Sequence, residues 1–368
     1  PADAMDYSDS IDHKLHPIHH SPQDALPRHT ELSVTQLQQR SHPQRPPTQA
    51  LRYILHLFCG RRRPTDVQAH YEHLQLNQPT ATVFLSIDVA ISESKCDMQD
   101  TKTVAMWRDA MHQGYVAALL GGPPCETHSR ARHLPVHCCH HLVSPGARCL
   151  TCSRRAPRPL RTSQHPWGLC GLTPKELTQV SLAGTLLRTT LLLMYEAQRL
   201  GIPALMEHPQ PPTDATKASS FRLPEALALR KLQGVSYFVF HQCTCGATTT
   251  KPTALLLTHA DEVKTLLQQR GHHGLCNHSN DHTPLGGRHS DGTWSTSPAK
   301  EYPDDMCRAL ATGLHQAIHR RWPELTCSHD TLARRLQDHD HHDLHATLDP
   351  YTDDTTQRRD TFYSELHT

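Results

Sequence analysis

Short apolar runs alternate with helix-like stretches between residues 51 and 320, and this alternation restricts the fold more than any other feature of the sequence. The runs expected to form strands are 51–59, 82–89, 115–120, 204–206, 235–241 and 254–258. A helix is expected to open at Pro64, and others to span 103–113, 176–200 and 304–320. Several strands end at glycine, cysteine or an acid, which is typical of the ligand-binding edge of an α/β protein. We therefore predict a doubly wound, mostly parallel α/β sheet.

The two ends of the chain lack this pattern. Residues 1–49 are rich in His, Pro, Gln and Ser without apolar periodicity, which predicts a disordered arm. Residues 326–368 are acidic and His-rich, which predicts a solvated tail that could hold a short helix over 331–336. The folded domain is therefore expected to span 50–325, with a basic, Cys/His-rich insertion at about 130–165.

Charge and cysteine content limit the class of protein. The 37 basic and 36 acidic residues exclude a globally basic nucleic-acid binder, although not a local basic patch. Thirteen cysteines spread over a long chain argue against a disulfide framework and for a reducing, intracellular compartment, the nucleus included. Arg188 and Glu196 interrupt the most apolar stretch, so we expect no membrane span, and the residues after Pro1 show no secretion leader.

Three expected strands end in residues suited to chemistry: Phe58-Cys59-Gly60, Gly122-Pro123-Pro124-Cys125 and Met206-Glu207-His208-Pro209. The prolines stiffen the backbone before Cys125, and a helix over 126–132 would place its thiol near a helix N-terminus, which favours the thiolate. Glu207, at a neighbouring strand end, could exchange a proton beside it. Taken singly, Cys125 could be a small buried residue and Glu207 a helix cap. Their position at adjacent strand ends favours a site.

Six motifs follow one another along residues 51–320: Phe58-Cys59-Gly60, Asp88 at the end of the second expected strand, Cys96-Asp97-Met98, Gly122-Pro123-Pro124-Cys125 with Ser129, Glu207-His208-Pro209, and Gly246–Leu256 with Lys251. In this order they resemble the motifs of the DNA (cytosine-5)-methyltransferases. The most specific piece is GGPPCETHS at 121–129. The resemblance implies a Rossmann-like fold of the S-adenosylmethionine-dependent methyltransferase type, with DNA as the partner.

The resemblance also implies a role for each matching residue. Cys125 would attack C6 of a cytosine turned out of the duplex, and Glu207 would hydrogen-bond and protonate N3. Lys251 takes the first arginine position of a Gln-x-Arg-x-Arg motif and is counted with the catalytic residues. S-adenosyl-L-methionine would supply the methyl group for C5. The residues implied to bind it are Phe58, Gly60, Asp88, Asp97, Gly122 and Pro123.

Some positions depart from the family pattern and leave a second interpretation open. Three arginines at 61–63 follow Gly60, where the family has a Gly-rich loop, and they could obstruct the cofactor pocket or pair with a carboxylate or phosphate. Thr253 stands where the second arginine of the later motif is expected. The second interpretation is a non-catalytic relative that keeps the fold and binds nucleic acid or a nucleotide.

A basic segment follows Cys125 and predicts a nucleic-acid partner independently of any family. No acid occurs from Thr127 to Lys175, whereas the segment carries eight positive charges. Clustered arginines with prolines between them suit contacts to a phosphate backbone, although a flexible basic linker would have the same composition. The residues expected to contact nucleic acid are Ser129, Arg130, Arg132, Arg154, Arg155, Arg158 and Arg161.

Two groups of cysteines and histidines have spacings that resemble metal sites. The first is Cys138-Cys139-His140-His141 with Cys149 and Cys152; the second is His272, His273, Cys276, His278 and His282. Because 32 of 368 residues are histidine, such groups also arise by coincidence, and we assign no metal ligand from the sequence. A zinc-stabilised interaction module remains a third interpretation. A cysteine hydrolase is less attractive, since spacing fixes no histidine as the partner of Cys125.

Overall fold

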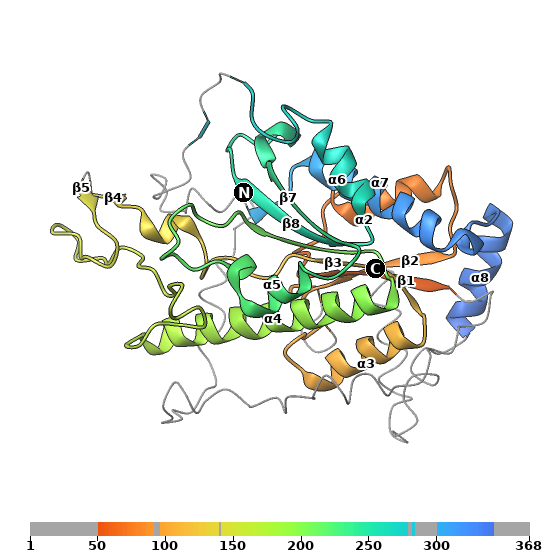
Figure 1. Cartoon of the computed structure of the whole chain (residues 1–368), viewed down its shortest axis with the longest axis horizontal. Coiled ribbons are helices and arrows are strands. Elements are labelled where there is room, and N and C mark those ends of the chain that lie inside the picture. Colours follow the sequence, from red (N-terminus) through yellow and green to blue (C-terminus); the bar gives the residue numbers. More distant parts are fainter. Residues whose placement is uncertain (1–50, 92–95, 140, 279–281, 284–299, 342–368) are drawn as a thin grey trace. The chain divides into compact units, whose positions relative to one another are not determined.

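The computed structural model describes residues 51–91, 96–139, 141–278, 282–283 and 300–341 (Figure 1). The arm predicted for 1–49 and the tail beyond residue 341 lie outside these described residues. All thirteen cysteines lie within them, and all thirteen are free thiols.

One six-stranded sheet forms the centre of the fold, in the order β2-β1-β3-β6-β8-β7. Its strands are β1 (Arg52–Leu57), β2 (Thr82–Ile87), β3 (Val116–Gly121), β6 (Ala204–Pro209), β7 (Val235–His241) and β8 (Pro252–Thr258). The neighbours from β2 to β6 pair in parallel, whereas β8 runs antiparallel to both β6 and β7. This arrangement confirms the predicted α/β class and the mostly parallel sheet, and it is compatible with a Rossmann-like fold.

Helices cover both faces of the sheet (Figure 1). The side chains of α2 (Val67–Gln75), α6 (Asp261–Gln268) and α7 (Asp304–Arg321) pack into one buried cluster with one face of the strands. Those of α3 (Thr101–His112), α4 (Pro174–Leu200) and α5 (Pro224–Leu229) pack into a second cluster on the other face. Ala118 and Leu120 of β3 point into the first cluster and Leu119 into the second, so the strand is apolar throughout because both of its faces are buried.

Most predicted elements match the structure within a few residues, and the differences have local causes. β6 extends to Pro209 because Glu207 and His208 continue its pairing with β8, although their polarity hides them from an apolar pattern. The short helices α5 and α6 were not recognised in the sequence. In α6 only Val263 and Leu267 are buried, so its apolar stripe is too brief to stand out.

The chain beyond Leu325 continues into a helix, α8 (His329–His341), which is longer than the one considered for 331–336. Leu332 and Cys327 pack against the core cluster that contains α7. A small hairpin, β4 (Val136–Cys138) with β5 (His141–Val143), lies in the predicted insertion. Regular structure in the described part of residues 130–165 is otherwise limited to the 3₁₀ turn η1 (Arg130–His133).

Within the described residues, one helix is long and apolar enough to span a bilayer. This helix is α4, and 56% of its most apolar window is buried in the structure. Leu187, Leu191 and Met194 of α4 belong to the core cluster on the sheet. Packing against the sheet therefore accounts for its apolar composition.

Candidate functional site

Strand pairing brings three of the predicted motifs to one edge of the sheet. Leu57 of β1 pairs with Gly121 of β3, and Gly121 pairs with Met206 of β6. The residues that follow these three therefore emerge side by side at the carboxyl ends of parallel strands. β8 enters at the same edge, since Lys251 directly precedes it and its Nζ lies 4.0 Å from Oε1 of Glu207. We call Cys125, Glu207, Lys251 and Tyr302 the sheet-edge site.

Glu207 is buried at this edge, and only one of its two carboxylate oxygens accepts a hydrogen bond from a described residue. Its Oε2 accepts a hydrogen bond of 3.2 Å from the hydroxyl of Tyr302. Its Oε1 is buried and has no hydrogen-bond partner among the described residues. Burial raises the pKa of the Glu207 carboxyl, and Lys251 and Tyr302 only partly oppose this. The site thus shifts the pKa of Glu207 upward and leaves its Oε1 without a hydrogen bond from a described residue, with the Lys251 ammonium 4.0 Å away.

Tyr302 is a site residue that sequence reasoning missed. It directly precedes the start of α7, and a Cβ added to Gly122 would lie 2.7 Å from its hydroxyl oxygen, so the glycine gives the ring room. Burial, then the neighbouring Glu207, raises the pKa of Tyr302 well above its usual value. The only signal in the sequence is an aromatic residue before a helix, which does not specify a site.

Cys125 lies in the loop after β3, and its environment differs from the one predicted. Residues 125–128 form a turn in which the N–H of His128 donates to the carbonyl of Cys125. The prediction of a helix over 126–132, with the thiol near its N-terminus, is wrong. Burial, reinforced by Glu126, raises the pKa of Cys125 to about 12, so the thiol keeps its proton.

The turn after β1 has the geometry expected of a loop that approaches a ligand closely. Phe58 and Gly60 both have positive φ angles, of 60° and 71°. Asp88 accepts hydrogen bonds from the backbone N–H of Gly60 at 2.9 Å and of Ala90 at 2.8 Å. A Cβ added to Gly60 would meet no atom within 4 Å, so open space lies beside its backbone.

Two of the arginines after Gly60 turn toward acids of the protein itself. Arg62 donates to Asp66, the N-cap of α2, with Nε 2.6 Å from Oδ2. Arg63 pairs with Glu301 at 3.1 Å and donates to the carbonyl of Tyr302. These contacts direct the two side chains away from the space beside Gly60.

The other residues implied to hold a cofactor are separate from this turn in the chain. Pro123 is buried in the loop before Cys125. Asp97 accepts from the N–H of Gln99 at 2.9 Å, in a tight turn just before α3. Residues 92–95, which join it to β2, lie outside the described part of the chain.

A cleft of about 500 Å³ lies beside the sheet-edge site. It is lined by Arg63, Gln242, Cys245, Gly246, Ala247, Thr248, Thr249, Thr283 and the run 301–305. Tyr302 lines the cleft, and its hydroxyl donates to Oε2 of Glu207. Neither Cys125 nor Glu207 lines it, so Tyr302 connects the cleft to the catalytic candidates.

A pair of buried histidines lies behind the loop of Cys125. The rings of His128 and His208 meet edge to face at 5.2 Å between centroids. Burial lowers the pKa of His208 to about 3 and that of His128 well below its usual value, so both rings are neutral. They act as packing residues beside the site.

The predicted basic segment divides into buried and exposed arginines. Arg161 is 1% exposed and donates to the hydroxyl of Thr127 and to the carbonyls of Pro166 and Val180. Burial lowers its pKa to about 10. The prediction that Arg161 contacts nucleic acid is wrong, because its side chain has no surface with which to reach a phosphate.

Arg132 and Arg158 also donate hydrogen bonds to other residues of the protein. Arg158 makes a two-pronged pair with Glu176, at 2.9 and 2.7 Å, and donates to a backbone carbonyl. Arg132 donates to the carbonyl of Glu126 and to the side chain of Gln179 on α4. These two arginines fasten the insertion to α4 and to the Cys125 loop.

The remaining basic side chains of the insertion face solvent. They are Arg130, Arg148, Arg154 and Arg155. Ser129 caps the turn η1, where its hydroxyl accepts from the N–H of Ala131 at 3.2 Å. The charge available to a partner is therefore smaller than the sequence suggests.

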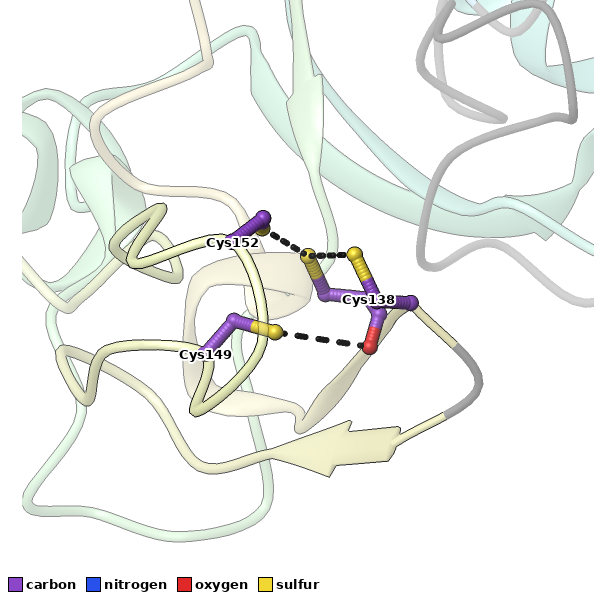
Figure 2. Close-up of side chains that lie close together, drawn as sticks. Cys138, Cys149 and Cys152 are labelled. Atoms are coloured by element: carbon purple, nitrogen blue, oxygen red, sulfur yellow. Dashed lines mark hydrogen bonds between the residues drawn. The ribbon is translucent and has the colours of Figure 1, made fainter.

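Four cysteines of the insertion converge into a group that could hold a metal ion. Figure 2 labels three of them, Cys138, Cys149 and Cys152. The Sγ atoms of Cys138, Cys139, Cys149 and Cys152 all lie within 4.8 Å of one another. The Cys138 and Cys152 sulfurs are 3.3 Å apart, and Cys149 donates to the carbonyl of Cys138. Backbone N–H groups of Cys152 and Thr151 point at Cys149 and help to lower its pKa to about 6.

A second group that could hold a metal ion consists of Cys243, Cys276, His278 and His282, again within 4.8 Å of one another. The structure thus adds Cys243 to the histidine-rich group noted in the sequence and leaves out His272 and His273. Cys243 lies more than thirty residues before the others, so only the fold could reveal it.

Sequence comparisons with protein-family models and with curated proteins give no relative for this chain. No protein-family model matches it, and no curated protein matches it in sequence. The chemistry of the sheet-edge site and of the two metal-ligating groups is therefore the basis for its function.

Proposed function

We propose that the sheet-edge site activates a cytosine for methylation at C5, with Cys125 as the nucleophile and Glu207 as the proton donor. The observation that carries this proposal is the buried Glu207, whose Oε1 has no hydrogen-bond partner among the described residues while its pKa is raised. A carboxyl in this state can donate a hydrogen bond to a ring nitrogen. Unused polar atoms are rare in protein interiors and call for a ligand.

The roles follow from the chemistry of each side chain. A proton donated by Glu207 to N3 draws electrons from the ring and makes C6 open to attack by the sulfur of Cys125. The Cys125 thiol would lose its proton to solvent as the S–C6 bond forms, since burial keeps it protonated beforehand. After the methyl group has passed to C5, the C5 proton would leave to solvent, the S–C6 bond would break to return the free thiol, and N3 would give its proton back to Glu207. Lys251, 4.0 Å from Glu207, places a positive charge where it stabilises the Cys125 thiolate as it forms and the carboxylate left on Glu207.

S-adenosyl-L-methionine would supply the electrophilic methyl group, and the turn after β1 fits it. A Cβ at Gly60 would meet no atom within 4 Å, and two of the three arginines that could obstruct the turn, Arg62 and Arg63, pair with Asp66 and Glu301. Phe58, Gly60, Asp88, Asp97, Gly122 and Pro123 are the residues proposed to hold it. On this proposal the sheet is of the methyltransferase type.

The partner proposed is nucleic acid, DNA in particular, bound through the exposed arginines of the insertion. Arg130, Arg154 and Arg155 are free of the buried contacts that engage Arg132 and Arg158. We further propose that the four-cysteine group binds zinc, because four cysteine sulfurs within 4.8 Å complete a tetrahedral site without water. Such an ion would stabilise a segment that has little secondary structure of its own.

One observation favours a second candidate, a non-catalytic relative that binds nucleic acid or a nucleotide. The Cys125 thiol has a pKa of about 12. The hydroxyl of Tyr302 donates a hydrogen bond to one carboxylate oxygen of Glu207. A protein that no longer transfers methyl groups needs neither a reactive thiol nor a free carboxyl.

Methyl transfer by the full chain tests the first candidate against the second. Titration calorimetry with S-adenosylmethionine and S-adenosylhomocysteine measures binding, and transfer of a radiolabelled methyl group to cytosine-containing DNA measures activity. Cys125→Ala should abolish transfer and spare binding of both cofactor and DNA. Cys170→Ala, an exposed cysteine outside both metal-ligating groups, is the matched control.

The outcomes separate the two candidates. Transfer that survives in Cys125→Ala would overturn the assignment of the nucleophile. Micromolar cofactor binding without transfer by the wild-type chain would favour the non-catalytic relative. Absence of cofactor binding by a folded wild-type chain would refute the methyltransferase proposal.

A further inference from the structure

Segments on either side of β8 and α6 meet in the second metal-ligating group. Cys243 lies in the 3₁₀ turn η3 (Gln242–Cys245), which follows β7. Cys276, His278 and His282 lie in the segment after α6. Cys243 is buried and His278 is exposed, so the group is at the surface but has a closed inner side.

The spacing of the Cys276, His278 and His282 ligand atoms is close to that around a tetrahedral ion, and the Cys243 sulfur lies within 4.8 Å of all three. The Sγ of Cys276 lies 3.7 Å from the Nε2 of His282 and 3.7 Å from the ring nitrogens of His278. A zinc ion with Zn–S near 2.3 Å and Zn–N near 2.0–2.1 Å separates its ligand atoms by roughly 3.3–3.8 Å. The two histidine Nε2 atoms are closer, at 2.8 Å, and would separate by about half an ångström on binding.

The donor set points to zinc rather than to a hard cation. Two thiolates and two imidazoles are ligands that calcium and magnesium avoid and that zinc prefers. Four protein ligands also leave no open position for water or substrate, which is the mark of a structural site.

The backbone around the ligands is held in place by the protein. The N–H of Cys276 donates to Nδ1 of His241 at 3.2 Å, and the N–H of His241 donates to the carbonyl of Gly274. A Cβ at Gly274 would come within 2.7 Å of the ring of Phe238, so glycine lets this segment lie on β7. Cys276 therefore faces Cys243 as a consequence of the fold.

Residues next to the ligands hold the loop that ends at Lys251. Gln242 precedes Cys243; its N–H donates to the carbonyl of Lys251 at 3.3 Å, and its side chain donates to Thr253 at 3.0 Å. Thr283 follows His282, and its N–H donates to the carbonyl of Thr248 at 3.0 Å. An ion joining Cys243 to His282 would thus fix loop 246–251 at Thr248 and at Lys251.

We propose that Cys243, Cys276, His278 and His282 form a second zinc site, which fixes loop 246–251 and thereby positions Lys251 beside Glu207. The zinc site stands on its own, and only the use made of Lys251 rests on the proposed function. In this proposal the zinc ion positions Lys251 through the loop and takes no part in the chemistry.

Zinc content of the purified full chain tests the site without any assay of methyl transfer. The wild-type chain should carry two equivalents of zinc. The pair Cys276→Ser with His282→Asn should remove one, and the pair Cys138→Ser with Cys152→Ser should remove the other. His273→Asn, a neighbouring histidine outside the group, is the control and should keep both.

The variant that lacks the insertion cysteines keeps the test decisive even if the other variant fails to fold. One remaining equivalent of zinc in Cys138→Ser/Cys152→Ser supports the second site, and none overturns it. Cobalt(II) bound to this variant should show tetrahedral bands with charge transfer from two thiolates. A spectrum without thiolate charge transfer would overturn the ligand assignment.

Chemical acetylation read by mass spectrometry tests the effect on Lys251. Its side chain is 14% exposed, so acetylation should become several-fold faster when zinc is removed by a chelator. The exposed Lys231 is the control and should react at an unchanged rate. Equal rates for Lys251 with and without zinc would overturn the positioning role.

Discussion

The sheet-edge site and the insertion are neighbours in the chain, yet different forces hold them in place. Cys125, Glu207 and Lys251 are positioned by strands whose pairing is part of the central sheet. The insertion has only a hairpin and a 3₁₀ turn in its described residues, together with a cysteine group that could hold a metal ion and the buried Arg161. The sheet-edge site should therefore lose its structure only when the whole domain unfolds. The insertion should lose its structure when single residues are replaced.

The largest effect expected is loss of the insertion when its cysteine group cannot bind metal. A structural zinc site contributes on the order of 10 kcal/mol to the folding of a small module. Cys138→Ser with Cys152→Ser should make trypsin cleave after the exposed Arg148, Arg154 and Arg155 roughly ten-fold faster, because the open form becomes populated.

Mass spectrometry of the tryptic products locates these cuts, and circular dichroism should show the sheet retained. Cys170→Ser is the control, since this cysteine belongs to neither metal-ligating group. Cleavage at the wild-type rate would show that the insertion does not depend on the cysteine group.

Arg161 joins the two regions, so its replacement should weaken both. It donates to Thr127 in the Cys125 loop and to Val180 on α4. Arg161→Met should lower the free energy of unfolding by roughly 3 kcal/mol, because several buried acceptors lose their donor. Urea unfolding measures this loss, and Arg154→Met should stay within about 0.5 kcal/mol of wild type. Equal stability of the two variants would contradict the buried role of Arg161.

The protonation of Glu207 gives the sheet-edge site its own pH dependence. Its pKa is raised in the folded state, so the folded protein binds this proton more tightly than the unfolded chain does. The stability it contributes is complete below the unfolded pKa and is lost as the pH rises through the folded pKa. Lys251, Tyr302 and Cys125 are the titratable groups that face it.

Glu207→Gln should remove this dependence. Relative to wild type, the variant should become more stable as the pH rises, by about 1.4 kcal/mol for each unit by which the pKa is raised. Glu176→Gln is the opposite control: Arg158 helps to lower the Glu176 pKa to about 2, so that variant should be less stable at neutral pH and recover in acid. Thermal unfolding from pH 4 to pH 8 measures both. Parallel pH profiles for Glu207→Gln and wild type would contradict the raised pKa.

The smallest effect expected is on nucleic-acid affinity through the exposed arginines. Arg154→Gln with Arg155→Gln should leave stability unchanged and reduce the slope of log affinity against log salt by about 1.8, for two phosphate contacts at about 0.9 each. Lys102→Gln with Lys231→Gln, two exposed cations outside the insertion, is the control. A salt slope that changes equally in both pairs would show that the insertion is not the contact surface.

The site illustrates where sequence reasoning succeeds and where it stops. The pattern of strands and turns placed Cys125 and Glu207 at strand ends, whereas Lys251 was named only from the family resemblance. The structure brings Lys251 to the same edge, with its Nζ 4.0 Å from Glu207. The protonation of the Cys125 thiol could not be predicted from the pattern. The residues after it form a turn and not the expected helix, and burial raises the pKa of the thiol. The roles of Tyr302 and Cys243 could not be predicted from the pattern either, since the residues that they contact are distant in the chain.

The sequence by itself determined the alternation of strands and helices, the polar residues at strand ends and the cysteine spacing of the insertion. These features are local, because hydrophobic periodicity and turn residues act over a few positions. Only the tertiary structure decided that Arg161 is buried while Arg154 is exposed, and that Cys243 meets His282. Burial and the choice of partner depend on which segments the fold brings together, and residues far apart in the chain carry no local sign of it.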